Sequence, residues 1–366
     1  MDPRISQSAK LLIWLSDRFP EANRSRFADE EAYVRWQFSA AQWLWPRVVS
    51  KCLDLQGKKV VDLGCGPGGK TMFYSTLSPA HIIGIDCAEA KIASAQRFLT
   101  STARRRSNCE FRLGRAEATG LEAGQHDIVI SEDGFEHFSD LEGILREAHR
   151  ILCDGGLFLI MFAPYWGPDG PHLYNFIRLP YAHYFFSWST MSQATRAIAA
   201  RMERHGTPQT QSPALGLQIE QELTQLEQVS FGLRHLRTFF DWRALERAAR
   251  AGTTGTRATD DASFATATPT QQAEREIAQL EHFINKISLR RFKRLLKLQI
   301  GWELVGFHRY VYQRRRAAFV ITRNMWPIDE IYGSLVFLLR KAAGKRIRAS
   351  DFRSLQTRMS IGRVLE

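Results

Sequence analysis

The segment from Val60 to Gly69, VVDLGCGPGG, constrains the fold more than any other part of this 366-residue chain. A short apolar run passes directly into closely spaced glycines, and a second apolar run, IIGID, ends in Asp86. A buried strand, a glycine turn, a helix and a second strand that ends in a carboxylate build a ligand pocket at the carboxyl end of a parallel sheet. The sequence therefore predicts an α/β fold with a binding site beside these two strand ends.

The glycine spacing alone leaves the ligand open. Gly64 and Gly66 form the dinucleotide pattern G-x-G-x-x-G with Gly69 and the shorter pattern G-x-G-x-G with Gly68. Glycine tolerates positive φ and lets a ligand lie against the main chain. A tight strand-to-helix turn that binds no ligand can have the same glycines. The side chains next to the turn are therefore needed to infer whether it binds a ligand and which one.

Three side chains near the turn favour S-adenosylmethionine over a nicotinamide dinucleotide. Asp62 lies two residues before the first glycine, where a carboxylate repels a pyrophosphate but suits an ammonium and a sulfonium. Pro67 removes an N–H group that a phosphate site would use. Asp86 is placed to accept hydrogen bonds from two ribose hydroxyls.

Five segments resemble the class I S-adenosylmethionine-dependent methyltransferases, in particular the bacterial small-molecule group related to the ubiquinone and menaquinone methyltransferases. The segments are VDLGCGPGG at 61–69, IGID at 83–86, GRAE at 114–117, DIVISEDGFEHF at 127–138 and LREAHRILCDGGLFLIM at 145–161. The likeness covers residues 58–185 and, more weakly, 283–312. It implies a Rossmann-like sheet, parallel with one antiparallel edge strand, and S-adenosylmethionine as the cofactor.

The resemblance also implies which residues contact the cofactor. The glycine turn is expected to wrap its methionine part, the second strand end to bind its ribose, and the fourth strand's tip to lie beside it. The residues concerned are Asp62, Gly64, Cys65, Gly66, Gly68, Asp86, Cys87, Ala116, Glu117, Glu132 and Asp133. Arg115 stands where the family often has an acidic residue that contacts the adenine amino group. We therefore expect that contact from Glu117 or from the backbone of Ala116.

Hydrophobic periodicity predicts the order of the elements. Strands are expected at 58–63, 81–86, 109–113, 126–131 and 156–162, and helices at 69–77, 88–101 and 139–152. Asp154-Gly155-Gly156 is expected to end the last of these helices. Later helices are expected at 190–205, 216–250, 271–283 and 289–298, with a strand at 302–312 and a short amphipathic helix over 332–339.

These elements divide the chain into five parts. They are an N-terminal helical segment (1–56), the cofactor-binding core (57–163), a helical insert with a flexible loop at 251–270 (164–285), the completion of the core (286–325) and a basic tail (326–366). In the family resembled, additions at the position of this insert commonly cover the acceptor. A substrate lid and a structural or dimer-forming insert both remain open.

Three histidines are candidates for a general base, which a hydroxyl acceptor needs and a more acidic acceptor does not. The imidazole pKa lies close to neutrality. We rank His172, in the loop after the fifth predicted strand, first, His183 second, and His137 third. Each could instead make a structural hydrogen bond. The histidine spacings do not indicate a metal site.

The net charge of +12 is concentrated at one end, because residues 286–366 hold 19 Lys and Arg against five Asp and Glu. Such a region suits nucleic acid, an anionic membrane surface or a phosphorylated substrate, or simply solvent. No apolar run approaches the ~20 residues of a membrane helix. The start of the sequence shows no signal segment, and five scattered cysteines form neither a disulfide framework nor a zinc site. We expect a cytoplasmic protein.

The function expected is a methyltransferase that uses S-adenosylmethionine and acts on a small-molecule, lipid-linked or carrier-linked acceptor. O-methylation in secondary-metabolite, sugar or cell-envelope biosynthesis is the favoured form. An RNA methyltransferase that uses the basic region, and a non-catalytic protein that binds the cofactor, are the alternatives. The motif SEDGFEH after the fourth strand differs from the N-P-P-Y type that serves base nitrogens, which disfavours nucleic acid.

Overall fold

The computed structural model describes residues 5–18, 30–50, 53–101, 107–165, 173, 176–179, 181–204, 268–282, 287–310 and 334–352. These residues belong to two compact units. One unit is an α/β sheet with its covering helices, and the other is helical. Among the described residues, no helix combines the length and apolar character needed to span a bilayer.

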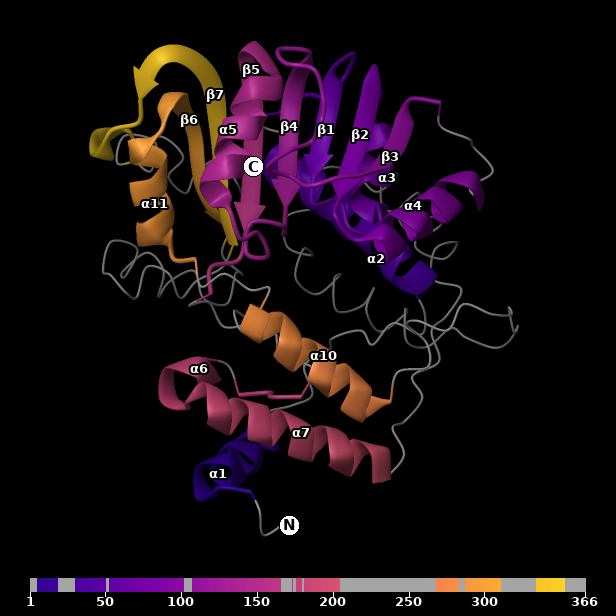
Figure 1. Ribbon diagram of the computed structural model, residues 1–366, viewed down its shortest axis with the longest axis vertical. Coiled ribbons are helices and arrows are strands. Elements are labelled where there is room, and N and C mark those ends of the chain that lie inside the picture. Colours follow the sequence, from indigo (N-terminus) through magenta and orange to yellow (C-terminus); the bar gives the residue numbers. More distant parts are fainter. Residues whose placement is uncertain are drawn as a thin grey trace, which may run out of the picture. The chain divides into compact units, whose positions relative to one another are not determined.

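The α/β unit contains a seven-stranded sheet of order β3-β2-β1-β4-β5-β7-β6 (Figure 1). Its strands are β1 (Lys59–Leu63), β2 (His81–Asp86), β3 (Cys109–Leu113), β4 (His126–Glu132), β5 (Leu152–Phe162), β6 (Ile300–Tyr310) and β7 (Ser334–Arg346). β1 to β5 pair in parallel, whereas β7 is antiparallel to both β5 and β6. The expected Rossmann-like sheet is confirmed, but the antiparallel strand β7 lies one place in from the rim and not at the edge.

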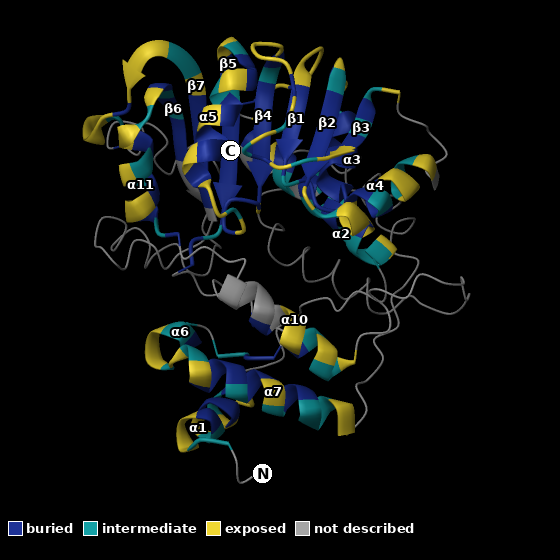
Figure 2. Cartoon of the chain, in the orientation of Figure 1, coloured by how far each residue is buried: buried dark blue, intermediate teal, exposed yellow. Residues whose placement is uncertain are grey.

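Helices cover both faces of this sheet, and the strands are buried almost throughout (Figure 2). α5 (Leu141–Ile151) and α11 (Leu289–Leu298) pack on one face, with Val61 and Phe162. On the other face, with Val60, lie α3 (Gly69–Ser75), α4 (Glu89–Ser101), and α2 (Glu30–Leu44) with the π-helical turn Trp45–Val49. Successive strand residues point to opposite faces, so a doubly covered parallel sheet needs continuous apolar runs.

Two local predictions are wrong. An amphipathic helix was expected over 332–339, but from Ser334 onward this segment is the first half of β7, in which Leu335–Leu339 are buried. A short apolar run does not distinguish such a strand from a buried helix. Asp154-Gly155-Gly156 does not end a helix either: α5 ends at Ile151, and these residues form an irregular start of β5.

The described helices of the helical unit are α1 (Gln7–Ser16), α6 (Ala182–Phe185), α7 (Trp188–Arg204) and α10 (Pro269–His282). Its core includes Leu12, Ile198 and Ile277. The N-terminal segment is therefore divided, since α1 belongs to this unit and α2 to the sheet unit. The helix expected at 216–250 and the loop expected at 251–270 lie outside the described residues.

Candidate functional site

The glycine turn after β1 adopts backbone angles that favour glycine at three alternate positions. Gly64, Gly66 and Gly68 have φ of 76°, 56° and 84°. Side chains with a Cβ rarely adopt this region. A Cβ added at Gly66 would meet no atom within 4 Å, whereas one at Gly64 would lie 2.8 Å from the ring of Phe138. The backbone at Gly66 is therefore open to a ligand, and the turn around it is tightly packed.

Asp86, at the end of β2, is directed at this turn. Its Oδ2 accepts a hydrogen bond from the Gly66 N–H at 2.9 Å, and its Oδ1 accepts one from the Ala88 N–H at 2.9 Å. The residue is only 9% exposed. A carboxylate oxygen can accept more than one hydrogen bond, so Asp86 can brace the turn and still bind a diol.

Asp62, at the end of β1, is buried beneath the turn. Its Oδ2 accepts a hydrogen bond of 2.6 Å from the Thr71 hydroxyl at the start of α3. Burial raises the pKa of Asp62 to about 7, although the Thr71 bond acts in the opposite direction. A positively charged ligand beside Asp62 would stabilise its ionised form.

Lys70 joins α3 to the tip of β4. Its Nζ lies 2.7 Å from Glu132 Oε1 and 2.6 Å from Asp133 Oδ2. Burial disfavours the charge on Lys70, but the two carboxylates outweigh it and raise the Lys70 pKa. Tyr74 donates its hydroxyl to the other oxygen of Glu132. Asp133 has a φ of 55°, in the left-handed region that few residues other than glycine adopt, although aspartate tolerates it better than most.

Two buried oxygens near Lys70 accept no hydrogen bond from the described part of the chain. They are Oε2 of Glu136 and Oε1 of Gln37. Gln37 lies on α2 directly over the turn, because a Cβ at Gly69 would lie 2.6 Å from the Gln37 Cβ. Burial, with Asp133 nearby, raises the pKa of Glu136 well above its ordinary value. A ligand that carries N–H donors and positive charge would satisfy such oxygens.

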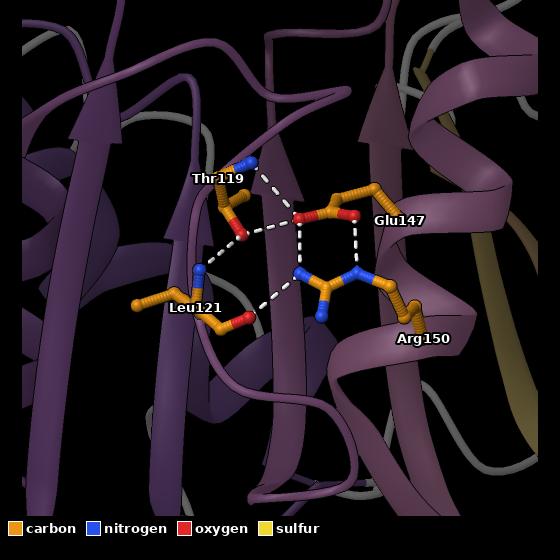
Figure 3. Close-up of polar contacts among 4 residues, drawn as sticks. All are labelled: Thr119, Leu121, Glu147 and Arg150. Atoms are coloured by element: carbon orange, nitrogen blue, oxygen red, sulfur yellow. Dashed lines mark hydrogen bonds and ion pairs between the residues drawn. The ribbon is translucent and has the colours of Figure 1, made fainter.

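The loop between β3 and β4 is clamped to α5 by Glu147 (Figure 3). Its Oε1 accepts a hydrogen bond of 2.9 Å from the Thr119 N–H, and the guanidinium of Arg150 donates to both of its oxygens. Arg150 also donates to the Leu121 carbonyl at 2.7 Å. Burial opposes the charge on Glu147, but the hydrogen bonds prevail and lower its pKa to about 2. The clamp fixes the segment that follows Ala116.

Most of the residues predicted to contact the cofactor lie at one end of the sheet. The glycine turn, Asp62, Asp86, Glu132 and Asp133 gather at the carboxyl ends of β1, β2 and β4. Cys65 is buried in the turn and Cys87 is exposed. Ala116 is buried, and the Glu117 carboxylate accepts a hydrogen bond of 2.7 Å from Arg115 Nε. The Glu117 carboxylate, one of the two groups expected to contact the adenine, is therefore already hydrogen-bonded to Arg115.

The three candidate bases fall in different parts of the chain, and their roles stay predictions. His137 is exposed shortly after β4, in the sheet unit. His183 belongs to the helical unit, where its ring packs against Tyr165 and Tyr184. His172 lies outside the described residues. Over the described ranges, no group of three or more His, Cys, Asp and Glu side chains is arranged to hold a metal ion.

Sequence reasoning missed Lys70, Tyr74, Glu136 and Gln37. The sequence contained a signal for Lys70, because it is the second residue of the helix GKTMFYS, which is otherwise free of charged side chains and is buried throughout. A buried lysine requires a carboxylate partner, and Glu132 and Asp133 were available.

The glycine turn and the strands around it lie in the part of the chain that is similar to known proteins. Residues 61–160 match the family described as "Methyltransferase domain". A demethylmenaquinone methyltransferase of Lactococcus lactis is 33% identical over 116 residues, 31% of this chain and 45% of that protein. A ubiquinone biosynthesis O-methyltransferase of Pseudomonas syringae is 36% identical over 104 residues, 28% of this chain and 43% of that protein.

Among solved structures, the PH0226 protein of Pyrococcus horikoshii is 32% identical, with a TM-score of 0.31. That match covers 34% of this chain and 54% of the other. The chain spans less than half the length of the two curated relatives. The matched segment begins at Val61 and includes the glycine turn, Asp86 and the tip of β4.

Proposed function

We propose that the chain, whose residues 61–160 match the methyltransferase domain family, transfers a methyl group from S-adenosylmethionine to a small-molecule, lipid-linked or carrier-linked acceptor. A hydroxyl is the favoured acceptor group. This includes O-methylation in secondary-metabolite, sugar or cell-envelope biosynthesis.

The observation that carries this proposal is that two buried carboxyl groups, Asp62 and Asp86, lie beside a glycine turn whose backbone is open at Gly66. Asp86 suits the two ribose hydroxyls, and the buried carboxyl of Asp62 suits a cation. A pyrophosphate at the same turn would bring negative charge toward Asp62. The unsatisfied oxygens of Gln37 and Glu136 add two acceptors that an ammonium group could use.

In the proposed reaction, an acceptor oxygen attacks the methyl carbon as the carbon–sulfur bond breaks. The bonding electrons remain on sulfur, which becomes the neutral thioether of S-adenosylhomocysteine, and the hydroxyl proton passes to a base. The reacting atoms must lie ~3–3.5 Å apart and in line, so positioning supplies much of the rate. His172 remains the first candidate base, His183 the second and His137 the third.

One relative supports the favoured acceptor group, because it is named as a ubiquinone biosynthesis O-methyltransferase. The name of another, a demethylmenaquinone methyltransferase, does not state the methylated atom. Both matches lie within the cofactor domain, so the acceptor of this chain is proposed from chemistry and not carried over. An RNA acceptor, suggested by the basic region, is the second enzymatic candidate. A protein that binds the cofactor without turnover is the third.

Calorimetry followed by a methyl-transfer screen tests the proposal. The full chain is titrated with S-adenosylmethionine and S-adenosylhomocysteine, then incubated with methyl-labelled cofactor and panels of phenols, sugars, lipid quinol precursors and RNA. Label transfer to a hydroxyl compound is expected. Transfer to RNA alone would replace the small-molecule proposal, and binding with no transfer to any acceptor class would favour the non-catalytic protein.

A further inference from the structure

We propose that α11 and the end of β7 form a docking surface for an anionic lipid bilayer, at the edge of the sheet opposite the cofactor site. The described segments 287–310 and 334–352 contain 11 Lys and Arg residues and only two acidic residues, Glu303 and Asp351. Both acidic side chains are engaged: Glu303 pairs with Arg340, and Asp351 accepts the Arg348 N–H. The surface therefore has a strong positive excess.

The basic residues of α11 lie on its outward side. Leu289, Phe292 and Leu296 are buried against the sheet, whereas five residues at helical spacing are exposed: Arg290, Arg291, Arg294, Lys297 and Leu298. Like charges three and four residues apart repel each other. The first turn of the helix also holds arginines and no acidic residue, which the helix dipole disfavours. An anionic partner would relieve both costs.

Strand pairing brings the end of β7 to the same place. Ile300, at the start of β6, is the register partner of Arg346 near the end of β7. Lys345, Arg346 and Arg348 are exposed there. Within the described part of the chain, these three side chains and those of Arg291, Arg294 and Lys297 form no ion pair. We call these six residues, with Leu298 and Ile300, the basic edge.

Two exposed aliphatic side chains favour lipid over polynucleotide. Leu298 is 67% exposed and Ile300 is 56% exposed, in the middle of the basic residues. Apolar side chains ringed by Lys and Arg are typical of surfaces that enter the headgroup region of anionic membranes. Single-stranded nucleic acid would instead be stacked on exposed aromatic rings, and the described phenylalanines of these segments, Phe292, Phe307, Phe337 and Phe352, are all buried.

The topology places the basic edge away from the chemistry. β7 runs antiparallel to β5, with Arg340 opposite Leu157 and Leu335 opposite Phe162. The end of β7 therefore lies at the amino end of β5, whereas Asp62, Asp86 and Glu132 lie at carboxyl ends of strands parallel to it. Exposed residues cover the end of β7 and the outer side of α11 in Figure 2. A bilayer held there lies away from the strand ends that carry the proposed cofactor residues.

Vesicle co-sedimentation of the full chain tests the proposal. Wild type is expected to bind phosphatidylcholine vesicles that contain phosphatidylglycerol, to ignore pure phosphatidylcholine, and to be released by salt. The double variant Arg294→Glu/Lys297→Glu is expected to bind about tenfold more weakly. The matched control is Arg97→Glu/Arg112→Glu, which changes the net charge equally on α4 and β3, at the other end of the sheet (Figure 1). The control is expected to bind like wild type.

A second variant separates lipid insertion from general attraction to negative charge. Leu298→Ser/Ile300→Ser keeps every charge, and it is expected to weaken vesicle binding several-fold with unchanged circular dichroism and cofactor affinity. Equal vesicle binding by the edge and control variants would overturn the proposal, as would binding that is insensitive to Leu298 and Ile300. Tighter binding of homopolymer RNA that depends on Arg294 and Lys297 would assign the surface to nucleic acid instead.

Discussion

Lys70 Nζ lies 2.7 Å from Glu132 Oε1, which ties the first turn of α3 to the tip of β4 across the buried floor of the candidate site. Lys70 also contacts Asp133, and Tyr74 donates to Glu132. One lysine thus serves two carboxylates, and Glu136 adds a third carboxyl group close by. We infer that the site is poised to accept additional positive charge.

Replacing Lys70 by methionine is expected to destabilise the protein by about 3–5 kcal/mol, because Glu132 is left as a buried charge without its partner. Urea unfolding monitored by circular dichroism measures the effect. Lys58→Met, at an exposed lysine before β1, serves as the control and should change the free energy of unfolding by less than ~0.5 kcal/mol. If Lys70→Met had the same free energy of unfolding as the control, the Lys70–Glu132 ion pair would not stabilise the fold as proposed.

Asp62→Asn is expected to increase stability at alkaline pH. The folded-state pKa of about 7 lies above the ordinary value of 3.8. The contribution of Asp62 is therefore full below pH ~4 and is lost as the pH rises through about 7. Removing the ionisable group should raise the free energy of unfolding by roughly 1–3 kcal/mol at pH ~8 and by little at pH ~4. An equal change at both pH values would contradict the assigned pKa.

The same group should make cofactor binding depend on pH. Ionised Asp62 attracts the positive charge of S-adenosylmethionine, so affinity is expected to increase as the pH rises through about 7. Asp62→Asn should flatten this dependence. Thr71→Val removes the hydrogen bond that lowers the Asp62 pKa, and should move the midpoint to higher pH. Calorimetric titrations across pH measure all three, and a midpoint shared by all would assign the effect elsewhere.

Asp86→Ala is expected to weaken S-adenosylmethionine binding by roughly 1.5–3 kcal/mol, because the ribose loses charge-assisted hydrogen bonds. The Gly66 N–H also loses its acceptor. Asp86→Asn retains one acceptor oxygen and should lose less. An unchanged dissociation constant in both variants would place the ribose elsewhere.

Glu147→Gln is expected to destabilise the protein by about 2 kcal/mol near neutral pH, a value discounted for the partial exposure of Arg150. The Glu147 pKa is lowered from 4.5 to about 2, so its stabilisation is present above pH ~4.5 and is lost as the pH falls toward about 2. The difference between variant and wild type should shrink over that interval in acid unfolding. Glu142→Gln, at an exposed position of α5, should behave as wild type throughout.

His172→Ala is expected to lower turnover with little change in cofactor affinity, because a general base acts on the acceptor and not on the methyl donor. His183→Ala and His137→Ala provide the comparison. Steady-state rates and calorimetry on each variant rank the three histidines. Loss of turnover and affinity together in His172→Ala would point to collapse of its loop and remove it as the base.

The sheet could be predicted from local patterns, whereas the charged floor of the site could not. β1, β2 and β4 are continuous apolar runs that end at glycines or carboxylates, so their type and order follow from sequence. β7 was mistaken for a helix because Leu335–Leu339 carries no period that separates the two. A buried strand in mid-sheet is set by its neighbours, which here are β5 and β6.

The candidate cofactor residues could be proposed from the sequence because glycine and aspartate occupy positions that the turn requires, and their contacts with the cofactor stay predictions. The contacts of Lys70 with Asp133 and Glu132 could not be predicted, because these residues lie 63 and 62 positions after Lys70 in the chain. Sequence gives the charges but does not show which of them become buried. Glu136 illustrates this, because nothing in its local sequence indicates that its carboxyl oxygen lacks a donor among the described residues.

Calorimetric titration with two ligands tests most directly the claim that the glycine turn holds a cationic methyl donor. The full chain is titrated with S-adenosylmethionine and, separately, with NAD, in wild type and in Asp86→Ala. The account predicts saturable binding of S-adenosylmethionine that weakens in the variant, and no binding of NAD. Saturable binding of NAD that depends on Asp86, with no heat from S-adenosylmethionine, would contradict it.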